Sequence, residues 1–106
     1  MPALIAYITV PDREEALRIG RALLEERLAA CINVLDGMQS VYRWQGALEE
    51  ARECVLLVKS TSTRKEALAA KVKELHKYDV PCIVFLPLEG GSPEYLAWIE
   101  RECGNA

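Results

Sequence analysis

The sequence predicts an α+β fold in a single domain over residues 1–106. Apolar runs of strand length and two helical patterns follow the order strand, helix, strand, strand, helix, strand, and a short helix ends the chain. The two strand–helix–strand units are similar in length, and 106 residues suit one domain. These observations predict the split β-α-β arrangement of ferredoxin-like folds, with a long hairpin and an extra C-terminal helix.

The first unit begins with residues 4–10, a nearly continuous apolar run that indicates a buried strand and stops at Pro11. Asp12, with Glu15 three residues later, has the spacing of a capping box. Apolar residues then recur at helical spacing up to Leu28, which predicts an amphipathic helix. Gly20 falls on its apolar side, so we expect it to allow close packing against the sheet.

Residues 29–34 and 40–46 both resemble strands, and Asp36-Gly37 between them predicts the turn of a hairpin. Alternation along the second strand places Tyr42 and Trp44 on one face and Arg43 on the other. Residues 47–53 are charged and are expected to extend the hairpin through a short loop. A hairpin with no wholly polar face predicts contact with a partner.

The second unit contains a buried strand at residues 54–59 and a helix that Thr63 and Glu66 are expected to cap. A further buried strand follows at residues 83–86. Ser92-Pro93 predicts the start of the last helix, because proline suits the first helical position. Its inner face is expected to be Leu96, Ile99 and Cys103.

Right-handed crossovers would put both main helices on one face of the sheet and leave the other face bare. Both the odd- and the even-numbered residues of the strands are apolar, so the second face of the sheet also has to be buried. A terminal helix of about ten residues is too short to mask four strands. The simplest cover is another copy of the chain, and we expect an oligomer.

Composition excludes several functional classes. The net charge is -3 with a pI of about 5.2, which argues against nucleic-acid binding. No apolar run is long enough for a membrane span, and the N-terminus lacks the basic start of a secretory leader. We therefore expect a cytoplasmic protein with no membrane partner. The four cysteines show no Cys-x-x-Cys spacing, and reduced thiols are expected.

Six motifs occur in order along the chain. They are Thr9-Val10-Pro11, Arg27-Leu28-Ala29-Ala30-Cys31-Ile32-Asn33, Ser40-Val41-Tyr42-Arg43-Trp44-Gln45-Gly46, Val58-Lys59-Ser60, His76-x-Tyr78-x-x-Pro81 and Tyr95-Leu96-x-Trp98-Ile99. Together they resemble the CutA divalent-cation-tolerance family over nearly the full length. The resemblance implies a ferredoxin-like homotrimer, similar to PII-type signal proteins, in which three sheets face inward and each hairpin reaches a neighbour. It also implies a link to copper and other divalent cations.

The chain departs from the family pattern at two places. Lys77 and Cys82 stand where the family usually has proline and glutamate. A thiol at position 82 is a softer ligand than a carboxylate. Some bacterial relatives also have a cysteine in the first strand and a second histidine in the loop, but here those positions are Ile8 and Leu75. Those ligands do not carry over.

The candidate metal ligands are His76, Cys82 and Cys31, because imidazole and thiolate suit copper(I) or zinc. His76 is the only histidine and follows the second helix. A structural role is the alternative, with the ring bonding a free carbonyl at the helix end. Lys59 and Tyr78 are candidates for holding a small anionic ligand in a cleft, although a surface lysine is the simpler reading of Lys59.

Three functions remain open. The first is a non-enzymatic homotrimer that binds copper or another divalent cation and contributes to tolerance. The second is a PII-like signalling module that binds a small ligand or protein partner in clefts between subunits. The third is an enzyme that uses Lys59, Tyr78 and His76, although no catalytic motif is present.

Overall fold

The computed structural model describes residues 2–104. The elements are β1 (Ala3–Val10), α1 (Arg13–Glu25), β2 (Cys31–Trp44), β3 (Ala47–Thr61), a 3-10 turn (Ser62–Arg64), α2 (Lys65–Leu75), β4 (Ile83–Pro87) and α3 (Pro93–Gly104). The strands form one antiparallel sheet in the order β2-β3-β1-β4. The predicted α+β, ferredoxin-like fold with a long hairpin and an extra C-terminal helix is confirmed.

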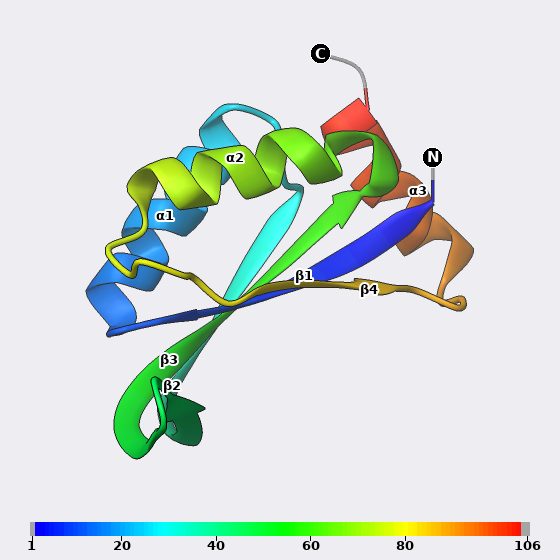
Figure 1. Cartoon of the computed structure of the whole chain (residues 1–106). Coiled ribbons are helices and arrows are strands. Elements are labelled where there is room, and N and C mark those ends of the chain that lie inside the picture. Colours follow the sequence, from blue (N-terminus) through cyan, green and yellow to red (C-terminus); the bar gives the residue numbers. More distant parts are fainter. Residues whose placement is uncertain (1, 105–106) are drawn as a thin grey trace.

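The two crossover helices, α1 and α2, lie side by side on one face of the sheet (Figure 1). The core between them and the sheet contains Ala6, Ile8 and Val10 of β1, Ile19 and Leu23 of α1, Leu56 and Val58 of β3, and Leu68 and Val72 of α2, all fully buried. None of the helices in the described part of the chain has the length and apolar character that crossing a membrane requires.

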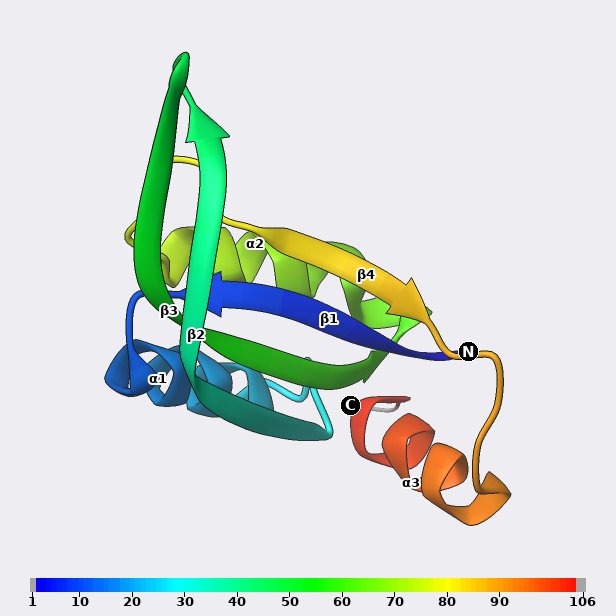
Figure 2. The same ribbon diagram turned by 90° about the horizontal axis from the view of Figure 1, so that it is seen from below.

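The opposite face of the sheet is only partly covered. Helix α3 lies beside one end of it, near the start of β1 (Figure 2), where Ile99 and Cys103 pack with Ala3. Farther along this face, Leu35, Val84 and Leu86 are exposed by 55%, 49% and 47%. We call this surface the open face. Grouped, exposed aliphatic side chains of this size are unusual on the surface of a monomeric protein.

Helix starts follow the sequence signals in two cases and depart from them in one. Asp12 caps α1 as predicted, because its Oδ1 accepts a hydrogen bond from the amide of Glu15 at 2.9 Å. Pro93 is the first residue of α3, also as predicted. The predicted cap at Thr63 is wrong: Thr63 lies within the 3-10 turn before α2, and its hydroxyl contacts that of Thr61 at 3.1 Å.

The hairpin turn is not at Asp36-Gly37, and that prediction is wrong. Residues 31–44 form the single strand β2, and the chain reverses at Gln45-Gly46. Both turn residues have positive φ, 49° and 83°, as a type I′ turn requires. Residues 47–53 are therefore the first part of β3 and not a loop.

Asp36-Gly37 forms a β-bulge instead. Leu35 pairs with Val55 and Met38 pairs with Glu53, so two residues of β2 stand opposite one of β3. Gly37 has φ 77°, and its amide bonds Asp36 Oδ1 at 2.8 Å. The extra residue reverses the parity of β2, so that the even-numbered residues beyond it share a face with the odd-numbered ones before it.

Helix α1 packs closely on the sheet at Gly20, as predicted. A Cβ added to Gly20 would lie 2.6 Å from Ile32 Cδ1 and 3.1 Å from Ile32 Cγ1. Real Cβ contacts are not this short, so glycine sets the distance between α1 and β2 here.

Candidate functional site

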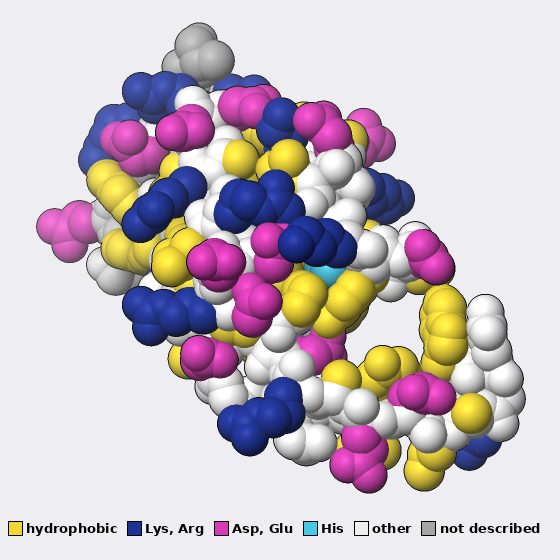
Figure 3. All heavy atoms as spheres, turned by 90° about the vertical axis from the view of Figure 1, so that its left-hand side faces the viewer, with side chains coloured by type: hydrophobic (Ala, Val, Ile, Leu, Met, Phe, Trp, Pro, Cys, Tyr) yellow, Lys and Arg dark blue, Asp and Glu magenta, His cyan; other side chains and the backbone are white. Residues whose placement is uncertain are grey.

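A groove lies between the far part of the β2–β3 hairpin, which we call the arm, and the connection that follows α2. Figure 3 shows this surface hollowed between the arm and the body of the molecule. The groove has a volume of about 810 Å³. Its walls are Tyr7 and Thr9 of β1, Met38, Gln39, Ser40, Val41, Tyr42 and Trp44 of β2, Glu53 of β3, and Lys77, Tyr78, Asp79, Val80 and Cys82 of the connection.

The bulge in β2 decides which side chains reach this groove. Met38, Tyr42 and Trp44 pair with odd-numbered β3 residues, the set that also includes Val55 and Leu57 of the open face. Without the extra residue at 36–37, these three side chains would point to the other side of the arm. The groove and the open face are therefore continuous.

Tyr78 and Glu53 join the two walls of the groove. The Tyr78 hydroxyl donates to Glu53 Oε2 at 2.7 Å, and Glu53 is only 8% exposed. Burial, followed by the hydrogen bond to the Glu53 carboxylate, raises the pKa of Tyr78 well above its ordinary value. Tyr78 thus stays a neutral hydrogen-bond donor at physiological pH.

His76 is held by both ring nitrogens. The amide of Tyr78 donates to Nδ1 at 3.1 Å, so Nε2 carries the proton and donates to the carbonyl oxygen of Thr9 at 2.7 Å. The residue is 9% exposed. The carbonyl belongs to β1 and not to the end of α2, and coordination of a metal by either nitrogen would displace one of these hydrogen bonds.

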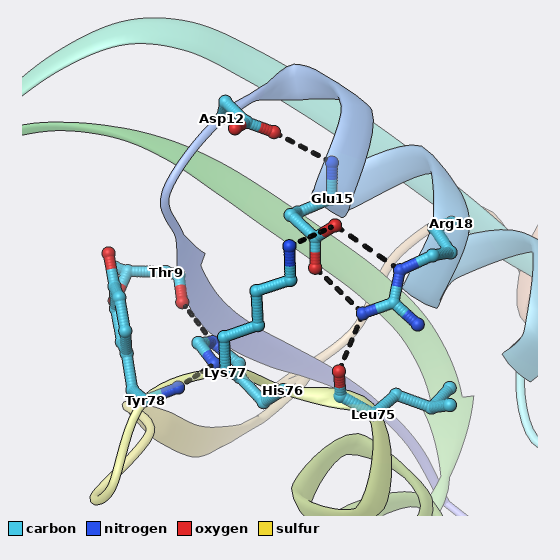
Figure 4. Close-up of polar contacts among 8 residues, drawn as sticks. All are labelled: Thr9, Asp12, Glu15, Arg18, Leu75, His76, Lys77 and Tyr78. Atoms are coloured by element: carbon cyan, nitrogen blue, oxygen red, sulfur yellow. Dashed lines mark hydrogen bonds and ion pairs between the residues drawn. The ribbon is translucent and has the colours of Figure 1, made fainter.

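A cluster of charges fixes the start of the connection (Figure 4). Arg18 of α1 contacts Glu15 Oε1 at 2.7 Å and the carbonyl oxygen of Leu75 at 2.6 Å. Lys77 Nζ lies 3.5 Å from the other Glu15 oxygen. The hydrogen bond from Arg18, opposed by burial and reinforced by the charges of Arg18 and Lys77, lowers the pKa of Glu15. The cluster ties the N-terminus of α1 to the C-terminus of α2.

Lys59 and Cys31 lie at the other end of the sheet. They are directly opposite one another on β3 and β2. Lys59 Nζ contacts the Tyr95 hydroxyl at 3.2 Å and lies 5.3 Å from that ring's centre. Lys59 is six residues from Glu53, roughly 20 Å along an extended strand. Within one copy of the chain, Lys59 and Cys31 are therefore far from Tyr78.

The structure thus divides the five predicted site residues into two groups. Tyr78 and Cys82 line the groove and His76 lies behind it, whereas Lys59 and Cys31 are elsewhere on the sheet. All four cysteines are free thiols. Across residues 2–104, no three His, Cys, Asp or Glu side chains come together as a metal site.

Glu53 is the groove residue that sequence reasoning missed. It stands in a charged stretch of 47–53 that resembles a solvated arm, and most of that stretch is exposed. The available signal was its position immediately before the apolar run that starts at Cys54. A carboxylate at the border of a buried strand is costly to place there without a partner.

Comparison with known proteins identifies the family. Residues 4–102 match the family model described as the CutA1 divalent ion tolerance protein. The chain belongs to this family. The resemblance seen in the sequence is confirmed, and the CutA1 fold is the one described above.

Individual CutA relatives are similar to this chain over most of its length. The divalent-cation tolerance protein CutA of Thermus thermophilus is 49% identical over 94% of this chain and 97% of its own length. The chloroplastic CutA protein of Arabidopsis thaliana is 37% identical over 99% of this chain, which spans 58% of that relative. Among solved structures, CutA1 from Oryza sativa has a TM-score of 0.95 at 36% identity, covering 100% of this chain and 97% of its own.

Proposed function

We propose that this CutA-family chain is a non-enzymatic, cytoplasmic homotrimer that binds divalent cations, copper among them, and contributes to metal tolerance. The observation that carries the proposal is the open face. Leu35, Val84 and Leu86 remain about half exposed on an otherwise packed sheet. Burial of aliphatic surface contributes roughly 25 cal/mol per Å², so covering this face with other copies would stabilise an assembly.

The distribution of donors supports the link between assembly and metal binding. Cys31 lies at one end of the sheet, and His76 and Cys82 lie at the other. One copy does not bring this thiol and the imidazole together. Neighbouring copies across the open face would bring donors of different subunits closer, and such a set suits copper(I) or zinc.

Titration calorimetry with copper and zinc tests the metal. We expect binding that weakens when Cys82 or Cys31 is changed to serine, because both side chains are partly exposed and accessible. Cys54→Ala is the matched control, since that thiol is fully buried in the core. Unchanged affinity in both serine variants would contradict the assignment.

Sedimentation of the same protein tests the assembly separately. Leu86→Lys places a charge on the open face and is expected to shift a trimer toward monomer. Trp44→Arg tests the contact of the arm in the same way. Glu89→Lys changes an exposed loop residue and is the control. A monomeric wild type, or a trimer that Leu86→Lys leaves intact, would contradict this part of the proposal.

A second candidate function is favoured by the groove. Its volume of about 810 Å³ lies within the range of small-molecule sites. A PII-like module would bind a small ligand or a partner there. A thermal-shift screen in which metabolites raise the melting temperature would support this function, and a screen in which only metal ions do so would count against it.

A further inference from the structure

His76 ties the connection after α2 to strand β1 through its whole ring. Its Nε2 donates to the carbonyl oxygen of Thr9 at 2.7 Å, and its Nδ1 accepts from the amide of Tyr78 at 3.1 Å. The ring centre also lies 4.6 Å from that of Tyr78. Figure 4 shows the imidazole between these two partners. Both hydrogen-bonding positions of the imidazole are therefore used within one copy of the chain.

The carbonyl of Thr9 marks both ends of the connection. The pairing of β1 with β4 runs as far as Ile8 and Ile83. One more step in the same register places Cys82 opposite Thr9. His76, at the start of the connection, bonds the same residue. The connection thus begins and ends beside one residue of β1, and His76 closes the loop between these points.

A metal at either ring nitrogen would break this closure. At Nδ1 the metal would replace the amide of Tyr78 and leave that N–H without its partner. At Nε2 it would move the ring proton to Nδ1, where the proton would face the same amide, and the carbonyl of Thr9 would lose its donor. A metal-binding histidine instead bonds the protein through one nitrogen and offers the other to the metal. These contacts lie within one copy, so they do not depend on what covers the open face.

We propose that His76 is a positioning residue that closes the connection on Thr9, and that the metal is bound without its imidazole. The inference rests on the proposed function, because it assigns roles within the same metal site. The donors left to the metal are the partly exposed thiols of Cys31 and Cys82. Thiolate ligands without imidazole suit a soft ion such as copper(I). His76 acts on this set through Cys82, at the other end of the closed loop.

Nitrogen-15 NMR of the metal-free protein tests the positioning role. His76 is the only histidine, so its ring nitrogens give the only imidazole signals of the chain. We expect the tautomer with the proton on Nε2, and slow exchange of that proton with water. A proton on Nδ1, or a ring proton that exchanges as fast as in an unfolded peptide, would overturn the proposal.

Addition of zinc to the same sample tests the ligand role. Zinc is the probe because it has no redox chemistry and does not oxidise thiols. The ring signals of His76 should stay in place while calorimetry detects binding. A zinc-induced change of either ring nitrogen would overturn the proposal. If calorimetry detects no binding of zinc or copper, the proposed function fails, and the metal-free spectrum decides the role of His76 by itself.

Three variants separate the two hydrogen bonds. His76→Asn keeps an acceptor for the amide of Tyr78, His76→Gln keeps a donor toward Thr9, and His76→Ala keeps neither. Hydrogen exchange of the Tyr78 amide should be as slow in His76→Asn as in the wild type and faster in His76→Ala. Equal exchange in all of these proteins would contradict the closure.

Zinc affinity in the variants separates a positioning residue from a ligand. His76→Gln should bind zinc within about twofold of the wild type, because the closure on Thr9 remains. His76→Ala should bind roughly tenfold more weakly, because the connection is released. Equal tenfold losses in both variants would indicate a lost ligand, and unchanged affinity in His76→Ala would contradict the action through Cys82. Circular dichroism checks that each variant is folded.

Discussion

The Tyr78 hydroxyl lies 2.7 Å from Glu53 Oε2, and this hydrogen bond joins the connection after α2 to the base of the arm. The two residues are 25 positions apart in the sequence. The contact closes one side of the groove and orients the carboxylate in it. It links the fold to the candidate site, because it joins side chains of two segments that lie on opposite walls of the groove.

Removing this hydrogen bond should destabilise the protein. Tyr78→Phe is expected to lower the free energy of unfolding by about 1.5 kcal/mol, near the lower end for a bond to a charged group because Tyr78 is only half-buried. Urea denaturation measures the change. Tyr95→Phe, which loses an exposed contact with Lys59, is the control and should cost less. Equal losses in the two variants would contradict a special role for Tyr78.

The same hydrogen bond predicts a dependence on alkaline pH. The pKa of Tyr78 is raised in the folded state, whereas the unfolded chain ionises near pH 10. The contribution of Tyr78 to the free energy of unfolding is therefore fully present below about pH 10, and it is lost as the pH rises further. Urea midpoints between neutral pH and pH 11 should fall less steeply in Tyr78→Phe than in the wild type. Parallel curves would show that another group controls the alkaline limb.

The Glu15 cluster predicts the opposite dependence at acid pH. The hydrogen bond from Arg18 lowers the pKa of Glu15 in the folded state, below the ordinary value of about 4.3. Its contribution to stability is present above that value and is lost as the pH falls below it. Glu15→Gln should flatten the loss of stability between about pH 5 and pH 3. Glu14→Gln, at an exposed neighbour in the same helical turn, should keep the wild-type slope.

Gly20 and Ile32 should show energetic coupling. Gly20→Ala gains helix propensity but forces a Cβ to within 2.6 Å of Ile32 Cδ1, and a net loss of about 1 kcal/mol is expected. Ile32→Val removes that terminal carbon, so the double variant should be more stable than the two single changes predict together. Denaturation of all four proteins measures the coupling, and simple additivity would show that the contact relaxes without cost.

The β-bulge should be sensitive to backbone strain alone. Gly37 has φ 77°, and nothing lies within 4 Å of a Cβ built there. Gly37→Ala is therefore expected to cost about 1 kcal/mol through conformation and not through collision. Gly90→Ala, in open space without a positive φ, should be nearly neutral in the same urea experiment. A neutral Gly37→Ala would indicate that the bulge adjusts its conformation.

The sequence by itself determined the elements and the family. Apolar periodicity predicted the helices and strands, Asp12 and Pro93 marked two helix starts, and Gly20 indicated the close approach of α1 to the sheet. These features succeed because each depends on residues that are neighbours along the chain. The six ordered motifs identified the CutA family for the same reason, since a family pattern is read directly from local sequence.

The tertiary structure decided the course of β2 and the composition of the groove. Asp36-Gly37 has the local chemistry of a turn, yet continuous pairing with β3 makes it a bulge, and Gln45-Gly46 reverses the chain. The bulge in turn puts Tyr42 and Trp44 on the same groove as Glu53 and Tyr78. Lys59, expected near Tyr78, contacts Tyr95 instead. Strand register and long-range contacts depend on pairing energies summed over many residues, and no local motif contains that sum.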